Sequence, residues 1–236
     1  MSLSIPENIE KVRHLISQYE KKYARIPASV QLIAVSKTHP ADKIRQAVNA
    51  GQVHFAENYL QEAVGKISEL HDLDIVWHFI GPIQSNKTHS IAENFRWVHS
   101  VDRLKIAQRL SEQRPTTLAP LKILLQVNIS GEESKSGIAL DELEQLAADC
   151  NELPGLILSG LMAIPAPTDD FEAQRQQFQQ LREARDNLLS RGLDNCIELS
   201  MGMSGDFEAA IAEGATMIRI GTDIFGPRVN NPESKR

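Results

Sequence analysis

The sequence predicts an α/β fold, and more narrowly a single (β/α)8 TIM barrel with an extra helix at its amino-terminal end. Eight short apolar runs of β-forming residues recur along the chain, and most consecutive runs are separated by polar segments with helical periodicity. The 236 residues suffice for eight such units. No linker rich in glycine, serine or proline divides them, so one domain is expected over residues 1–230, with a short tail over 231–236.

The elements follow in order along the chain. An amphipathic helix is expected from about Pro6 to Arg25, because apolar residues recur there at helical spacing and Pro27 ends the pattern. Strands are expected over 31–36, 53–56, 75–80, 96–100, 121–129, 156–164, 196–200 and 216–221. A doubly wound open sheet is the rival architecture, but no G-x-G-x-x-G motif follows the first strand.

Composition limits the classes of function. The chain has 31 acidic and 25 basic residues and a formal net charge of −6, which gives no electrostatic basis for binding nucleic acid or an anionic membrane. Two cysteines, Cys150 and Cys196, cannot build a disulfide framework and suggest a reducing compartment. The first ten residues lack the layout of a signal peptide, and no apolar stretch is long enough to span a bilayer. A soluble, cytoplasmic protein is expected.

In a barrel of this kind, chemistry is expected where strands end and helices begin. Lys37 ends the first strand, and counting by two puts it on the same face as Ile33 and Val35. A lysine at the inner rim of an apolar barrel loses hydration, which lowers its pKa and makes its amine a nucleophile toward carbonyl carbon. A solvated rim lysine is the plainer interpretation.

Arg219 lies in the last strand between Ile218 and Ile220. If the two isoleucines face the outer helices, the guanidinium points into the barrel. A buried guanidinium is costly unless it is paired, so Arg219 either holds a structural carboxylate or meets a ligand. Glu198 is a candidate carboxylate, because it precedes Ser200 by two residues on the neighbouring strand.

The loops after the seventh and eighth strands form the usual phosphate site of this fold. Here they contain the segment 200–206 (SMGMSGD) and the pair Gly221 and Thr222, which supply hydroxyls and flexible backbone. A turn and helix cap explains Ser204, Gly205 and Asp206 equally well.

Other polar residues have more than one interpretation. Asn58 either caps the helix after the second strand or projects its amide toward a ligand beside Lys37. Five histidines are scattered without a metal-ligand spacing and are interpreted as core or rim side chains, although a metal site stays possible: His39, His54, His78, His89 and His99. Lys135, in the loop after the fifth strand, either guides phosphate or is a solvated charge.

Seven motifs occur together: AVSKTHP at 34–40, FAENYLQE at 55–62, WHFIGPIQSNK at 77–87, SKSG at 134–137, GLMAI at 160–164, ELSMGMSGDFEAAI at 198–211 and RIGTDIFGPR at 219–228. In combination, and over about residues 5–228, they resemble the pyridoxal phosphate homeostasis protein family. Ala56 stands where that family often has glycine. The family is similar in fold to the N-terminal barrel of bacterial alanine racemases.

The resemblance implies roles residue by residue. Lys37 would form a Schiff base with pyridoxal 5′-phosphate (PLP), Arg219 would face the pyridine nitrogen, and Asn58 would lie near the cofactor. Four residues would bind the phosphate: Ser200, Ser204, Gly221 and Thr222.

The implied function is PLP homeostasis, meaning storage, buffering or delivery of PLP to PLP-dependent apo-enzymes, by a monomer without an established catalytic activity. Arg219 keeps its proton and cannot help to protonate the pyridine nitrogen as a carboxylate would, which weakens the ring as an electron sink. Two other functions stay open: a PLP enzyme such as an amino-acid racemase, and a Schiff-base isomerase or aldolase acting on a sugar phosphate.

Overall fold

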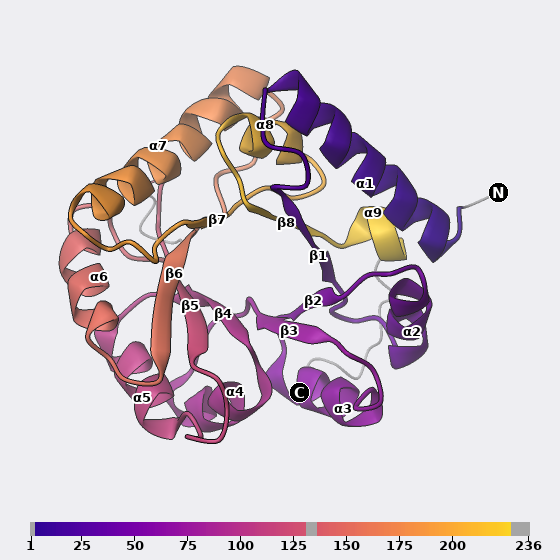
Figure 1. Cartoon of the computed structure of the whole chain (residues 1–236). Coiled ribbons are helices and arrows are strands. Elements are labelled where there is room, and N and C mark those ends of the chain that lie inside the picture. Colours follow the sequence, from indigo (N-terminus) through magenta and orange to yellow (C-terminus); the bar gives the residue numbers. More distant parts are fainter. Residues whose placement is uncertain (1–2, 131–135, 228–236) are drawn as a thin grey trace.

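Eight parallel strands close into a barrel in chain order, and the strands β1 and β8 pair to complete the ring (Figure 1). The computed structural model describes residues 3–130 and 136–227. The strands are β1 (Gln31–Val35), β2 (His54–Glu57), β3 (Val76–Phe79), β4 (Trp97–Val101), β5 (Leu121–Gln126), β6 (Leu156–Met162), β7 (Glu198–Ser200) and β8 (Met217–Ile220). The predicted (β/α)8 TIM barrel is confirmed.

Helices surround the sheet, and the predicted extra helix α1 precedes β1 (Figure 1). The helices are α1 (Ile5–Lys22), α2 (Ala41–Asn49), α3 (Leu60–Glu69), the 3-10 turn η1 (Ser85–Lys87), α4 (Thr88–Asn94), α5 (Leu104–Gln113), α6 (Leu143–Asn151), α7 (Phe171–Ser190), α8 (Phe207–Ala212) and α9 (Thr222–Phe225). Helix α1 begins with a capping box between Ser4 and Glu7, which satisfies amides that the first turn leaves without partners. No helix in the described ranges is both long and apolar enough to cross a membrane.

Most strand ends lie within one residue of the expected runs, but three do not: β6 ends at Met162 rather than residue 164, and β7 and β5 differ as well. Strand β7 begins at Glu198 rather than Cys196, and β5 ends at Gln126 rather than near residue 129. After β5 the chain continues as an isolated bridge between Val127 and Ile138. This bridge ties the segment after residue 135 back to the end of the strand.

Two groups of buried apolar side chains follow from the alternation of strand residues. The larger group packs the sheet against the helices. The smaller group consists of inward-facing residues that fill the barrel: Ile33, Val35, Ala56, Trp97, Leu124, Met162 and Met217. Ile33 and Val35 therefore lie on the inner face, as the sequence predicted.

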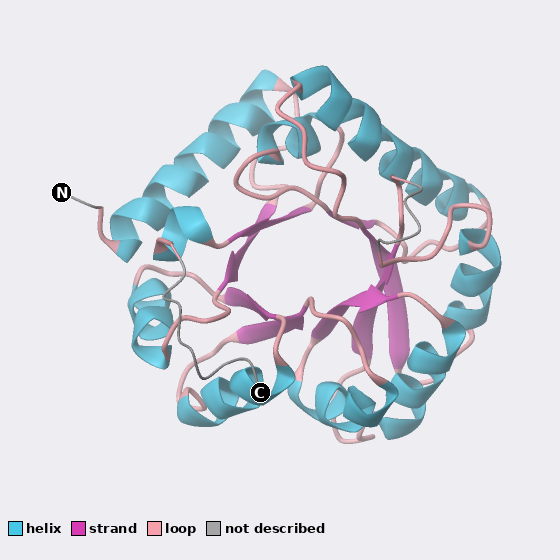
Figure 2. Ribbon diagram, turned by 180° about the vertical axis from the view of Figure 1, so that it is seen from behind, coloured by secondary structure: helices cyan, strands magenta, loops and turns pink. Residues whose placement is uncertain are grey.

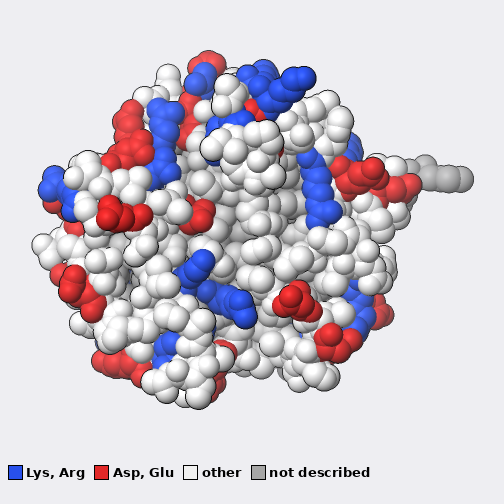
Figure 3. All heavy atoms as spheres, viewed as in Figure 1, with Lys and Arg blue, Asp and Glu red and all other residues white. Residues whose placement is uncertain are grey.

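The two ends of the barrel differ in character. Figure 1 looks at the end where the strands begin, and Figure 3 shows that most acidic and basic side chains on this face lie toward its edge, while a few basic ones reach closer to the centre. Figure 2 looks from behind, at the end where the strands finish and several long loops gather. In this fold the second end carries the functional site.

The two cysteines give a first prediction. Cys150 and Cys196 are both buried and both free, and burial raises the pKa of each thiol to about 12. Since the thiolate is the reactive form, neither residue should react with a thiol reagent in the native protein at pH 8. Both should react once the chain is unfolded in urea. Rapid labelling of the native protein, followed by mass spectrometry, would contradict this expectation.

Candidate functional site

A cavity of ≈ 430 Å³ lies at the end of the barrel where the strands finish. Its walls come from the ends of β1, β2, β3, β6 and β8 and from the loop after β7. Six of the seven predicted site residues line it: Lys37, Asn58, Ser204, Arg219, Gly221 and Thr222. The structure thus brings together residues that are as far as 185 positions apart in the sequence (222 − 37).

Lys37 reaches the cavity because it follows β1 by two residues and continues the inner face of that strand. The side chain is half-buried, with Val35 below it on the same cavity wall. This position agrees with the alternation that the sequence predicted for Ile33, Val35 and Lys37.

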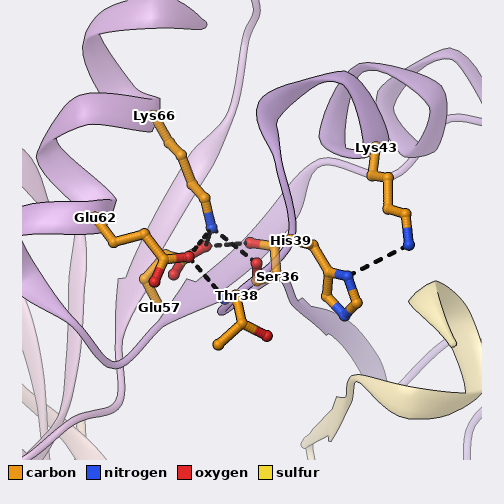
Figure 4. Close-up of polar contacts among 7 residues, drawn as sticks. All are labelled: Ser36, Thr38, His39, Lys43, Glu57, Glu62 and Lys66. Carbon is orange, nitrogen blue, oxygen red and sulfur yellow. Dashed lines mark hydrogen bonds and ion pairs between the residues drawn. The ribbon is translucent and has the colours of Figure 1, made fainter. Parts of the chain in front are cut away.

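A buried charged network supports the chain beside Lys37 (Figure 4). The Lys66 Nζ atom donates to the Ser36 carbonyl oxygen at 2.8 Å, to Glu57 Oε1 at 2.7 Å and to Glu62 Oε1 at 2.5 Å. The Ser36 hydroxyl donates to the same Glu57 oxygen at 2.6 Å. The residue on the amino-terminal side of Lys37 is therefore held through both its backbone and its side chain.

The same network also holds the residue on the other side of Lys37. The Thr38 backbone N–H donates to Glu62 Oε1 at 2.7 Å, and Thr38 has a φ of 65°. A β-branched residue rarely adopts this left-handed conformation, which costs on the order of 1–3 kcal/mol and persists only where the surroundings enforce it. Glu62 and Lys66 thus hold Lys37 in a strained turn.

Glu57 is a fully buried member of this network. Burial raises the pKa of its carboxyl group, while Lys66 and the Ser36 hydroxyl lower it. Its Oε2 atom has no hydrogen-bond partner among the described residues. Among the residues that the structure describes, Lys66 is therefore the only cation that pairs with the buried Glu57 carboxylate.

Arg219 forms the floor of the cavity and is only 3% exposed. Its guanidinium donates to Ser200 Oγ at 2.6 Å and to the Ala163 carbonyl oxygen at 3.0 Å. Burial lowers the pKa of Arg219 to about 10, and the negative charge of Asp206 opposes that change. Arg219 is still charged at neutral pH, and its inward orientation matches the sequence prediction.

Ser200 was predicted to bind the phosphate, but the structure places it away from the cavity lining. It is fully buried and is absent from the cavity lining, because its hydroxyl lies beneath the floor. There the hydroxyl contacts Arg219 and His99 Nδ1, the latter at 2.8 Å. The structure therefore gives Ser200 a place in the support of Arg219 and not at the cavity surface.

The predicted pairing of Glu198 with Arg219 is wrong. The Glu198 carboxylate instead accepts a hydrogen bond from the Thr216 hydroxyl. Strand stagger explains the difference, since Ser200 on β7 is level with Met217 on β8, two residues before Arg219. Glu198 therefore lies well below the guanidinium, and Asp206 is the carboxylate whose charge acts on it.

The loops after β7 and β8 meet at one side of the cavity, where Ser204 and Thr222 are part of its lining. Gly202 holds the first loop against the barrel: its φ is 95°, and a Cβ there would lie 2.6 Å from Ala210 Cβ. Its carbonyl oxygen accepts from the Arg219 N–H at 3.0 Å. A close backbone turn therefore positions this side of the cavity.

Asn58 is not the helix cap that one interpretation predicted. Helix α3 begins at Leu60 with Tyr59 at the cap position, and no side chain caps it. The Asn58 Oδ1 atom is buried at the cavity without a hydrogen-bond partner among the described residues. Gly81 fixes this segment, because a Cβ at that position would lie 2.1 Å from the Asn58 carbonyl oxygen.

Two residues that support the site were not identified from the sequence. Glu62 and Lys66 lie on a helix and resemble an ordinary i, i+4 surface pair, which hides their role beside Lys37. In the ranges 3–130 and 136–227, no group of three His, Cys, Asp or Glu side chains could hold a metal ion. Lys135 lies outside the described residues.

The chain is similar to proteins of known family. The family described as "Alanine racemase, N-terminal domain" matches residues 8–229. The pyridoxal phosphate homeostasis protein of Pseudomonas aeruginosa is 60% identical over 225 residues, which cover 95% of this chain and 96% of that protein. The protein of the same name from Escherichia coli K12 is 51% identical over 227 residues, or 95% and 97% of the two chains.

Solved structures agree with these relatives. PipY of Synechococcus elongatus PCC7942, solved with PLP bound, superposes with a TM-score of 0.84 at 39% identity and covers 94% of this chain and all of that one. Alanine racemase from Corynebacterium glutamicum, at 16% identity and a TM-score of 0.67, shares the fold over 98% of this chain and 62% of its own length. The chain belongs to the pyridoxal phosphate homeostasis protein family, whose barrel is of the alanine racemase N-terminal type.

Proposed function

We propose that this protein binds PLP in the cavity and takes part in PLP homeostasis by storing, buffering or delivering the cofactor. One observation carries the proposal: Lys37, Arg219, Ser204 and Thr222, which bear an amine, a guanidinium and two hydroxyls, all line one cavity. Its volume of ≈ 430 Å³ is in the usual range for a small-molecule site, about 300–1,000 Å³. The PLP-bound relative supports the same ligand.

The residues fit the parts of PLP. The Lys37 amine would condense with the aldehyde carbon to form a Schiff base, and one water molecule would leave. Three residues would bind the phosphate from the loops after β7 and β8: Ser204, Gly221 and Thr222. Asn58 would direct its unpartnered side-chain oxygen toward the ligand. Bound PLP supplies a reactive aldehyde and an electron-withdrawing ring.

Arg219 favours retention of the cofactor over turnover. Its guanidinium has only donors, so it would donate to the pyridine nitrogen and leave that nitrogen without a proton of its own. An unprotonated ring withdraws electrons less strongly, which disfavours the loss of an α-proton from a bound amino acid. Storage or delivery therefore suits this cavity better than racemisation.

The first test uses the wild-type protein. Titration with PLP should give a saturable absorbance change, and borohydride reduction should fix one PLP on the peptide that contains Lys37. A protein that takes up no PLP, or an adduct on another peptide, would contradict the proposal. Rapid exchange of amino-acid α-protons with D2O would instead establish a PLP enzyme.

We further propose that the single barrel domain, over residues 1–230, acts as a monomer and delivers PLP to PLP-dependent apo-enzymes in the cytoplasm. Ile164 and Met203 line the cavity and are 45% and 37% exposed, which supports apolar contact with a recipient at this end. Light scattering tests the monomer. Recovery of an apo-enzyme's activity in the presence of a PLP scavenger tests direct delivery.

A further inference from the structure

Arg219 is a buried cation with an unusual environment. Within the described ranges no carboxylate oxygen lies within hydrogen-bonding distance of its guanidinium, and its donors meet a hydroxyl and a backbone carbonyl. A buried charge normally requires a paired counter-ion. The Asp206 carboxylate acts on the guanidinium only through its charge: it accepts a hydrogen bond from the Met203 backbone N–H and none from Arg219.

A chain of hydrogen bonds continues from Arg219 across the inside of the barrel. Ser200 Oγ lies 2.8 Å from His99 Nδ1, and His99 Nε2 lies 2.9 Å from His78 Nδ1. His78 Nε2 in turn lies 2.9 Å from His54 Nδ1. The residues belong to β8, β7, β4, β3 and β2, so the chain crosses the barrel from β7 to β4.

Burial favours the neutral form of the imidazoles in this chain. His78 and His99 are fully buried, and burial lowers the pKa of each well below the ordinary value. The positive charge of Arg219 lowers the pKa of His99 further. Burial and Lys122 lower the pKa of His54, which is half-buried at the start of β2. Each imidazole therefore has one N–H donor and one acceptor nitrogen.

Arg219 fixes the direction of the chain. A guanidinium cannot accept a hydrogen bond, so Ser200 Oγ accepts from Arg219, and its only other described partner is His99. Unless the buried hydroxyl hydrogen is left without a partner, Ser200 donates it to His99 Nδ1. His99 then carries its hydrogen on Nε2 and donates to His78, and His78 donates to His54 in the same way.

This direction also suits the charge of Arg219. Each acceptor nitrogen, the negative end of its imidazole dipole, points back along the chain toward the guanidinium. In a buried, low-dielectric interior such aligned hydrogen bonds strengthen one another. We propose that His54, His78 and His99, acting through Ser200, are positioning residues that replace a counter-ion for Arg219 and hold its guanidinium at the cavity floor.

The first experiment concerns the ligand-free protein and does not depend on PLP. Two-dimensional 15N–1H NMR of histidine-labelled protein at pH 7.5 should show the Nε2–H tautomer alone for His54, His78 and His99. The exposed His14 and His89, which lie outside the hydrogen-bonded chain, serve as internal references. An Nδ1–H tautomer at His99, or a mixture of tautomers along the chain, would overturn the proposal.

The second experiment breaks the chain at one atom with Ser200→Ala and restores the hydroxyl with Ser200→Thr. In Ser200→Ala the single tautomer should be lost even at His54, at the far end of the chain, which a change in local packing would not cause. An unchanged His54 signal would overturn the proposal.

The affinity for PLP gives a third readout, which rests on the proposed function. Losing a hydrogen bond to a charged group should weaken PLP binding about tenfold in Ser200→Ala, and Ser200→Thr should recover most of it. Unaltered affinity in Ser200→Ala would contradict the positioning role. Failure of the wild type to bind PLP would instead overturn the proposed function. The histidine tautomers would still test whether His54, His78 and His99 position Arg219.

Discussion

Replacement of Lys66 by methionine is expected to lower the free energy of unfolding by about 3–5 kcal/mol, because it leaves a buried carboxylate without its cation. Lys66 is 7% exposed and bonds Glu57, Glu62 and the Ser36 carbonyl oxygen. Methionine fills similar space without a charge, so the loss is mainly electrostatic. Urea denaturation followed by circular dichroism measures it.

Two variants sharpen this experiment. Lys105→Met changes an exposed lysine on α5 and should alter stability by less than about 0.5 kcal/mol. Adding Glu57→Gln to Lys66→Met removes the unpaired charge and should recover part of the loss. A Lys66→Met protein as stable as the wild type would show that Glu57 does not depend on Lys66.

The deficit of Lys66→Met should also depend on pH. Burial already raises the pKa of Glu57, and removing the positive charge of Lys66 raises it further. A carboxyl group whose folded-state pKa lies above its unfolded-state value makes folding more favourable at low pH, where it is protonated in both states. The difference in unfolding free energy between Lys66→Met and the wild type should therefore shrink as the pH falls below the folded-state pKa that Glu57 has in the variant.

The barrel could be predicted from the sequence because its determinants are local. Strand and helix periodicities alternate along the chain, and short connections leave few topologies. Alternation also put Lys37 and Arg219 on the inner face, and the order of the fold put their loops at one end. Each of these predictions requires only the position of a residue within its own strand or helix.

What could not be predicted depends on how strands are placed relative to one another. The stagger between β7 and β8 separates Glu198 from Arg219 and puts Ser200 beneath the cavity. The bonds that link His54, His78 and His99 join three different strands. No spacing in the sequence shows such contacts, which explains why these histidines were interpreted as core or rim side chains, with a metal site left possible.

The Lys37→Ala variant is expected to lose the borohydride-stable PLP adduct completely while its fold stays intact. The covalent bond needs a primary amine at this position, and no neighbouring side chain could take its place without moving. Lys66, on α3, contacts the neighbouring Ser36, but its amine already makes three hydrogen bonds within the buried network. Mass spectrometry after reduction measures the adduct, and thermal unfolding measures the fold.

Non-covalent binding of PLP should survive in Lys37→Ala, because in the proposed complex Arg219, Ser204 and Thr222 would contact the ligand independently of the amine. Lys87→Ala is the matched control, since it removes a lysine of the same end of the barrel that does not line the cavity. It should keep both the adduct and the affinity. An adduct that persists in Lys37→Ala but disappears in Lys87→Ala would move the covalent site to Lys87. If Lys37→Ala unfolded instead, the network of Glu57, Glu62 and Lys66 would require the Lys37 side chain as well as its backbone, contrary to the contacts described above.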